Sequence, residues 1–416
     1  MKLSKNSKDL MLFFTKNKHI NTVKQTNRTN DILTELHKDI YDAYVFVNSL
    51  KRDTYYTITT KKIVNTSQIP RPKTFNANSF PDAVRMHIDE VAAAEVTYTF
   101  SLYGRTIKLI FVVEDGNIEL RIPTFNRYVD AIVMWLYILN LYASKQCANT
   151  LTVYFYFTSL EKSLPSTNIS ILDEMSVNTA FTRTCPTDSE IVVFRQEEWF
   201  KVFIHETFHN FALDFSDMNN TEAHQCILNI FKVKSDVNLY EAYMEFWAET
   251  MNALFCSFFS LKNKKNVDEF LTHAEFFMNF ERTYSFFQLV KTLNFMGLSY
   301  QDLYSSTGRS RMLRDNLYKE KTNVLAYYII KTILINNYQD FLFWCKKNNF
   351  SLLKFNKTLA NQREFCAFIE HKYKRLSMLT AIAETRRFIS SMGNKATSPK
   401  LNYILSNMRM SICELG

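Results

Sequence analysis

The spacing of apolar and polar positions divides the chain into a first part of mixed periodicity and a second part that is helical. Apolar residues recur at helical spacing over 31–50, and the period changes to two from residue 95. The last third of the chain returns to helical spacing, with few turn signals. The sequence therefore predicts an α+β fold, with a mixed helix and sheet lobe over 31–195 and a helical lobe over 196–416.

Short segments of the first lobe are predicted to form a sheet. The segment 150–158 is rich in β-branched and aromatic residues and suits a central strand. Asp115-Gly116 lies between two alternating runs, 109–114 and 117–122, which predicts a β-hairpin. A helix is expected over 128–145, and two further strands are expected over 177–184 and 190–194.

The helix predicted over 196–213 carries the motif His-Glu-Thr-Phe-His. One helical turn separates His205 from His209, so both imidazoles project from the same face and can reach one ion. Zinc accepts neutral imidazoles and keeps one coordination position open in catalytic sites. Glu206, next to the first histidine, can take the proton of an attacking water. The motif thus predicts a Zn²⁺ centre that hydrolyses protein or peptide substrates, with His205 and His209 as ligands and Glu206 as the catalytic base.

A catalytic zinc ion takes three protein ligands, and an apolar helix further along the chain offers three acids. Glu241, Glu245 and Glu249 are four residues apart and form a stripe on one face of that helix. Like charges at this spacing repel one another by roughly 0.2–0.5 kcal/mol per pair. A metal ion and histidines would offset this repulsion, whereas the alternative is a solvated acidic stripe.

These two helices resemble the gluzincin metallopeptidases, in which a helix after the His-Glu-x-x-His helix donates a glutamate. Glu245-Phe-Trp-Ala-Glu249 is similar to the Glu-Phe-Phe-Ala-Glu segment of the anthrax lethal-factor and proline-specific endopeptidase branch. That resemblance implies that Glu245 is the third ligand and that Glu249 orients a ligand histidine. A second alignment matches Glu241-Ala-Tyr-Met-Glu245 to aminopeptidase-like gluzincins and makes Glu241 the ligand. We prefer Glu245, and the resemblance covers only residues 177–254.

Two other parts of a peptidase site are harder to place. The segment 177–183 is expected to be an edge strand along which a peptide pairs by strand addition, with an ordinary sheet strand as the alternative. The lethal-factor branch has a tyrosine seven residues before its ligand glutamate, where this chain has Asn238. His224 is expected to be a packing or surface residue. The oxyanion-stabilising residue stays open among four candidates of the helical lobe, Tyr318, Tyr327, Tyr328 and Arg311.

The net charge of +9 is concentrated at the start of the chain. Residues 1–30 carry seven lysines and arginines against the single anion Asp9. We expect this segment to be a basic, flexible and solvated arm. Two other functions follow as alternatives to the peptidase, namely nucleic-acid binding through the arm and a structural or virion-associated role that retains a metal site.

The seven cysteines are scattered without a CxxC pair, which favours a reducing compartment and a fold without disulfide bonds. The longest apolar stretch, 131–143, is shorter than the roughly 20 residues of a membrane span. No secretory signal is visible at the N-terminus. We therefore expect an intracellular protein without a membrane span. Outside residues 177–254 the general character of the sequence resembles that of proteins of large DNA viruses, which would place it in the host cell or the virion.

Overall fold

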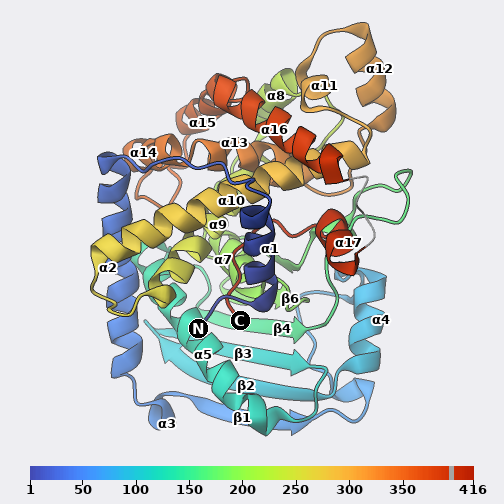
Figure 1. Cartoon of the computed structure of the whole chain (residues 1–416). Coiled ribbons are helices and arrows are strands. Elements are labelled where there is room, and N and C mark those ends of the chain that lie inside the picture. Colours follow the sequence, from blue (N-terminus) through green and yellow to red (C-terminus); the bar gives the residue numbers. More distant parts are fainter. Residues whose placement is uncertain (393–397) are drawn as a thin grey trace.

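The molecule combines one six-stranded sheet with a large helical body (Figure 1). The computed structural model describes residues 1–392 and 398–416. The predicted α+β class is confirmed, because the sheet belongs to the first half of the chain and the second half is mostly helical. The strands are β1 (Thr57–Lys62), β2 (Ala94–Leu102), β3 (Arg105–Val113), β4 (Thr150–Phe157), β5 (Ala180–Thr182) and β6 (Asp188–Val193).

The strand order is β1-β2-β3-β4-β6-β5, so the predicted central strand β4 lies inside the sheet. β4 pairs in parallel with both β3 and β6, and the other three pairings are antiparallel. Parallel strands covered on both faces are typically rich in apolar residues, and β4 is buried without interruption from Val153 to Phe157. β5 is the terminal strand, which confirms that the segment predicted over 177–183 contributes an edge strand.

The hairpin predicted at Asp115-Gly116 is wrong. β3 ends before this turn, and the helix α5 (Ile118–Tyr142) begins directly after it. The hairpin instead joins β2 to β3 through Tyr103 and Gly104, whose φ angles are 51° and 78°. A two-residue turn with both φ angles positive matches the twist of the strands that it connects. An Asp-Gly pair suits a turn of either kind, and the long buried face of α5 decides that a helix follows.

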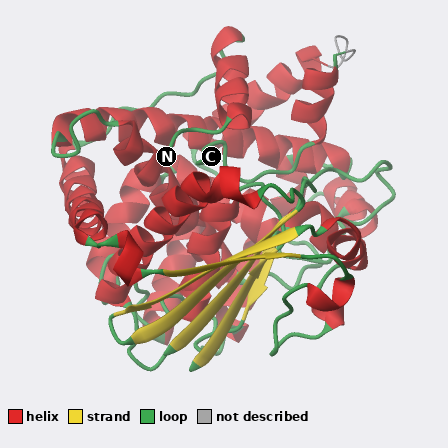
Figure 2. Ribbon diagram, turned by 90° about the horizontal axis from the view of Figure 1, so that it is seen from below, coloured by secondary structure: helices red, strands yellow, loops and turns green. Residues whose placement is uncertain are grey.

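Helices cover the two faces of the sheet unequally, and most of them lie on one side (Figure 2). The smaller core, on the other side, is built under α4 (Asp82–Val91) and includes Ile88, Ile110 and Tyr156. The main core is formed with α2 (Asn27–Ser49), α5, α7 (Trp199–Asn210), α9 (Leu239–Ser260) and α10 (Val267–Phe295).

The main core is continuous between the two predicted lobes, 31–195 and 196–416, because one cluster of buried residues draws on both. The other helical elements are α1 (Lys5–Lys16), α3 (Arg52–Tyr55), α6 (Glu174–Val177), α8 (Thr221–Ile230), α11 (Tyr300–Tyr304), α12 (Gly308–Leu317), α13 (Lys331–Asn336), α14 (Tyr338–Asn348), α15 (Leu359–Lys372), α16 (Leu376–Met392) and α17 (Pro399–Ser406), with the short 3₁₀ turns η1 (Thr66–Gln68) and η2 (Ala77–Ser79) and the π-helical turn η3 (Leu325–Ile330).

Residues 1–30 are folded against the body of the protein and are not the solvated arm that we expected. Phe14 of α1 is fully buried, and its ring lies 5.3 Å from that of Phe287 in α10. The segment after α1 follows α10, where the backbone N–H of Val23 donates to Asn279 Oδ1 at 2.7 Å. The buried residues of α1, namely Ser7, Leu10, Met11 and Phe14, are at helical spacing and form one face of the helix.

The two chain ends lie close together near the middle of the molecule (Figure 1). The backbone N–H of Ser4 donates to the carbonyl oxygen of Glu414 at 2.9 Å. The last residues run through the helical body, so Met408, Met410 and Ile412 are buried. This buried C-terminal segment contributes a wall to the candidate site described below.

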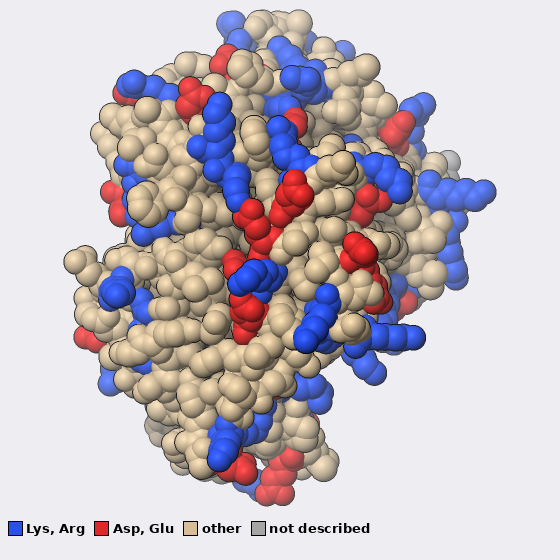
Figure 3. All heavy atoms as spheres, turned by 90° about the vertical axis from the view of Figure 1, so that its left-hand side faces the viewer, with Lys and Arg blue, Asp and Glu red and all other residues tan. Residues whose placement is uncertain are grey.

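The surface around α2 carries charges of both signs (Figure 3). Ion pairs join Lys38 to Asp42 within α2, and Glu35 of α2 to Lys346 of α14. Such exposed pairs contribute little stability. In the described ranges, no helix has the length and hydropathy required to cross a bilayer.

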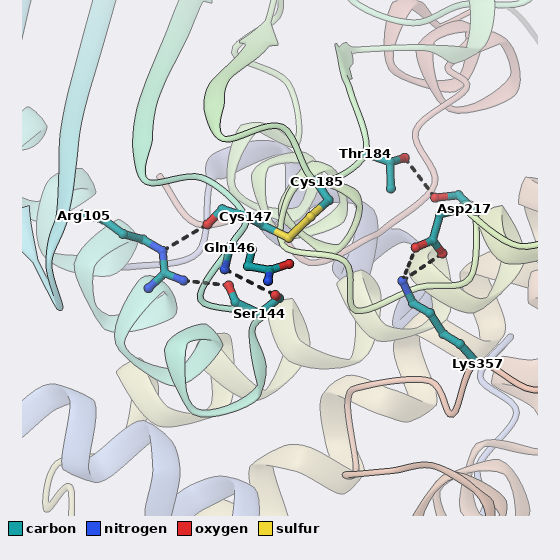
Figure 4. Close-up of a disulfide and its surroundings, with 9 residues drawn as sticks. Arg105, Ser144, Gln146, Cys147, Thr184, Cys185, Asp217 and Lys357 are labelled. Carbon is teal, nitrogen blue, oxygen red and sulfur yellow. Dashed lines mark hydrogen bonds and ion pairs between the residues drawn. A yellow bond between two sulfur atoms is a disulfide. The ribbon is translucent and has the colours of Figure 1, made fainter.

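A disulfide joins Cys147, in the loop before β4, to Cys185, in the loop between β5 and β6 (Figure 4). The Cα atoms are 4.7 Å apart, although 38 positions separate the residues in the sequence. The guanidinium of Arg105 donates to the carbonyl oxygens of Ser144 at 2.9 Å and Cys147 at 3.4 Å. The expectation of a fold without disulfide bonds is therefore wrong, and the cysteines no longer support a reducing compartment.

Candidate metal centre

The helix α7 places the motif histidines between the sheet and α9. Most of its side chains are buried, and it contacts both β5 and β6 on one side and α9 on the other. It ends where Ala212 adopts a φ of 57° and the N–H of Leu213 donates to the carbonyl oxygen of Phe208 at 2.9 Å. This left-handed residue reverses the chain. The reversal brings Asp214 back beside His209.

The imidazoles of His205 and His209 converge on one carboxylate of α9. His205 Nε2 lies 3.2 Å from Glu241 Oε2, and His209 Nε2 lies 3.5 Å from Glu241 Oε1. One donor atom from each of the three residues lies within 4.8 Å of the others. A single ion placed among these atoms can reach all three.

The second ring nitrogen of each histidine contacts a carboxylate of its own. His205 Nδ1 lies 2.9 Å from Glu245 Oε2, and His209 Nδ1 lies 2.5 Å from Asp214 Oδ2. A carboxylate at Nδ1 accepts the N–H there, which leaves the lone pair of Nε2 free to bind a metal. The contact of His205 is a hydrogen bond and favours the tautomer that presents Nε2 to the cluster, whereas His209 and Asp214 form an ion-pair contact without hydrogen-bond geometry.

The structure groups Glu241, and not the preferred Glu245, with the two histidines. Glu245 contacts Lys201 Nζ at 2.5 Å through its other oxygen, so both of its carboxylate oxygens are engaged away from the cluster. Glu249 contacts Lys331 Nζ at 2.5 Å and no histidine. The position predicted for Glu249, a carboxylate behind a histidine, is filled by Glu245. The preferred alignment is therefore displaced by one helical turn.

The acidic surroundings make this site attractive to positive charge. Burial alone would lower the pKa of His205, but hydrogen bonds with Glu241 and Glu245 raise it to about 9. Burial alone would raise the pKa of Glu241, but its hydrogen bonds with both histidines hold that pKa well below its usual range. Protons on the imidazoles compensate the carboxylates here, and a divalent cation between the same residues would do so equally.

Glu206 projects from α7 beside His205, and only 7% of its surface is exposed. Burial raises the pKa of its carboxyl, while the charges of His205 and His209 act in the opposite direction. A carboxylate with a raised pKa is better suited than an ordinary one to accept and return a proton.

Tyr327, in the π-helical turn η3, is the candidate tyrosine that reaches the cluster. Its hydroxyl donates to Glu241 Oε2 at 2.8 Å, and single π-helical turns often occur at functional sites. The hydroxyl of Tyr328 points elsewhere and donates to the carbonyl oxygen of Met408 at 2.7 Å. The other two candidates lie outside the cluster, Tyr318 beside Glu320 and Arg311 exposed on α12.

Sequence reasoning missed two residues that shape this site. Asp214 is a lone acid in the apolar run Phe-Ala-Leu-Asp-Phe, and this isolation was the available signal. Lys201 lies one helical turn before His205 and is buried against Glu245. His224 contacts the carbonyl oxygen of Val237 at 3.2 Å, outside the cluster, in agreement with its expected packing role.

A small cavity of ≈ 30 Å³ opens beside the first histidine. A larger cavity of ≈ 370 Å³ lies next to it and shares Asn178 and Ala180 with it. Both cavities lie beside the start of β5. The small cavity is lined by Lys162, Val177, Asn178, Thr179, Ala180, Lys201, Val202, His205, Glu206, Glu245, Tyr327 and Met410.

No protein-family model, curated protein or solved structure matches this chain. The likeness of its two helices to gluzincins stays a prediction.

Proposed function

We propose that this protein is a zinc-dependent endopeptidase whose metal is held by His205, His209 and Glu241. The convergence of both Nε2 atoms on Glu241, with a separate carboxylate behind each Nδ1, carries this proposal. Carboxylates in that position are the usual partners of metal-binding histidines. Catalytic zinc commonly has two histidine nitrogens and one carboxylate oxygen as protein ligands, and its fourth position is open to water or substrate. The residues present therefore fit the ion.

The side chains around the cluster supply the remaining parts of peptide hydrolysis. Bound zinc would polarise the scissile carbonyl and make water a better nucleophile. Glu206 would take the proton of the attacking water and deliver it to the leaving amine. Tyr327, whose hydroxyl already contacts Glu241, would turn that hydroxyl toward the developing oxyanion.

The position of β5 supports a peptide as the substrate. β5 ends the sheet, so its outer edge can accept an added strand. The two cavities that share Asn178 and Ala180 lie at the start of this strand. An extended peptide along β5 would therefore pass the cluster with side chains directed into these cavities.

The decisive experiment compares Glu206→Gln with the unaltered protein. We expect the purified full chain to contain zinc by elemental analysis and to hydrolyse a peptide mixture, and we expect a chelator to abolish hydrolysis. Glu206→Gln should keep the zinc and lose at least about 100-fold in activity, because a general base typically contributes 10²–10⁴-fold. His205→Ala should lose the zinc.

Glu222→Gln is the matched control, because this glutamate is exposed on α8 and pairs only with Arg363 on the surface. It should retain both zinc and activity. Zinc-loaded protein that hydrolyses no peptide would instead indicate a structural metal site. A fully active Glu206→Gln variant would refute the assigned role of the base.

A further inference from the structure

The small, open cavity beside Glu206 is bordered by three separate parts of the chain. Lys201 and Val202 of α7 form one wall, Thr179 before β5 forms another, and Met410 of the C-terminal segment closes it. Its volume of ≈ 30 Å³ holds about two water molecules. Typical ligand pockets are about ten times larger. The space next to the proposed base therefore fits only a small group.

Buried ion pairs fix the walls of this cavity. Lys162 pairs with Glu198, and both side chains are essentially unexposed. Glu198 in turn accepts the backbone N–H of Met410 at 3.1 Å, so the segment that closes the cavity is anchored to the start of α7. Lys201 is held by Glu245. Breaking a buried pair leaves an uncompensated charge and is strongly unfavourable, so these pairs hold the backbone on both sides of the cavity in place.

The relative direction of α7 and β5 indicates which substrate residue enters the cavity. Asn210, at the end of α7, donates to Thr182 at the end of β5 at 3.0 Å. Val202, nearer the start of α7, lies instead with Thr179 in the lining of the cavity. A peptide added antiparallel to β5 therefore directs its C-terminal part toward the cavity. The residue that follows the scissile bond is the one placed there.

We infer that this cavity is a specificity pocket for a small side chain, namely glycine, alanine or serine, directly after the scissile bond. The inference rests on the proposed peptidase function and names its substrate class. It assigns Met410 and Val202 as the residues that set the size limit, since they contribute the apolar side chains that close the pocket.

The test is digestion of a defined peptide library by the zinc-loaded full chain, with cleavage sites read by mass spectrometry. We expect glycine, alanine and serine to be preferred after the scissile bond over leucine and phenylalanine by at least about tenfold. Met410→Ala should raise the ratio of kcat/KM for leucine over alanine at that position by about tenfold or more. Val202→Ala serves the same purpose if Met410→Ala does not fold. Met312→Ala, on the exposed face of α12, should leave the ratio unchanged.

The outcomes separate the two proposals. Two results would refute the specificity pocket but not the peptidase activity. One is cleavage without a size preference for the residue after the scissile bond. The other is a preference confined to the residue before that bond. An unchanged ratio in folded Met410→Ala and Val202→Ala would likewise refute the pocket alone. Zinc-loaded protein that cleaves nothing in the library overturns the peptidase and the pocket together.

Discussion

The carboxylate of Asp214 lies behind His209 and is completely buried, so its influence on the site depends on one contact of 2.5 Å. Asp214→Asn keeps the shape of the side chain and removes the charge. Because residues behind a ligand histidine typically contribute 10–100-fold to metal affinity, we expect zinc binding to weaken by about that factor. Competition with a chelating dye measures the change.

Asp217→Asn provides the control, because Asp217 lies three residues further on and is about half exposed, paired with Lys357. Its zinc affinity should equal that of the unaltered protein. Equal affinities in the two variants would show that Asp214 does not support a ligand.

Glu320 makes the stability of the protein depend on pH. Burial raises the pKa of its carboxyl to about 7, although hydrogen bonds from Ser235 and the N–H of Leu325 act against this. The folded state therefore keeps a proton that the unfolded state releases at lower pH. Stability from this group is fully present below about pH 4.5 and is lost as the pH rises through about 7, to a total of about 3 kcal/mol.

Glu320→Gln should remove this dependence, since glutamine is neutral, its amide oxygen can accept from the N–H of Leu325, and its NH2 can donate to the hydroxyl of Ser235. We expect the variant to gain stability relative to the unaltered protein between pH 5 and pH 8, as measured by urea unfolding at both values. A difference between the two proteins that does not change with pH would contradict the assignment.

At the scale of elements, α1 is held by its apolar face and not by its charges. Phe14→Ala removes a fully buried ring that contacts α10 and should lower the free energy of unfolding by about 3–5 kcal/mol. Leu12→Ala, on the 45% exposed face of the same helix, should cost less than about 1 kcal/mol. Chemical denaturation of both variants measures these values. Equal, small losses would mean that α1 is not docked in solution.

The pairing of α7 with α9 explains why the acid that lies nearest both histidines is Glu241, one turn before the Glu245 preferred from the sequence. The acids of α9 recur every four residues, so a shift of one turn preserves every feature of the sequence pattern. Packing distinguishes the three acids, because each one contacts a different set of basic side chains. Glu241 faces the histidines, Glu245 also meets Lys201, and Glu249 meets Lys331.

At the scale of the whole molecule, the disulfide links two loops of the sheet (Figure 4). Cys147 precedes β4, and Cys185 lies between β5 and β6, beside the end of α7. Closing a loop of 38 residues restricts the unfolded chain and should stabilise the protein by roughly 3–4 kcal/mol. Replacing both cysteines with serine should therefore lower the melting temperature, and adding a reductant should do so in the unaltered protein.

Cys226→Ser is the control, because this cysteine is free and only partly buried. Its melting temperature should still fall when reductant is added. Alkylation of the unfolded, unreduced chain followed by mass spectrometry should leave Cys147 and Cys185 unmodified. Alkylation of all the cysteines would disprove the bond.

The sequence by itself determined the features that depend on local periodicity. The α+β class, the central strand β4, the long helix α2 and the placement of His205 and His209 on one helical face all follow from the spacing of residues within single segments. Such patterns record which face of an element is buried, so they can be read without knowing what covers that face.

Only the tertiary structure decided which distant residues meet. The choice of Glu241, the return of Asp214 to His209, the Cys147–Cys185 bond and the burial of α1 each need contacts between elements. Periodicity fixes the face of a helix but not its axial position against a neighbour. The energy that fixes this position comes from packing and buried ion pairs across the whole core.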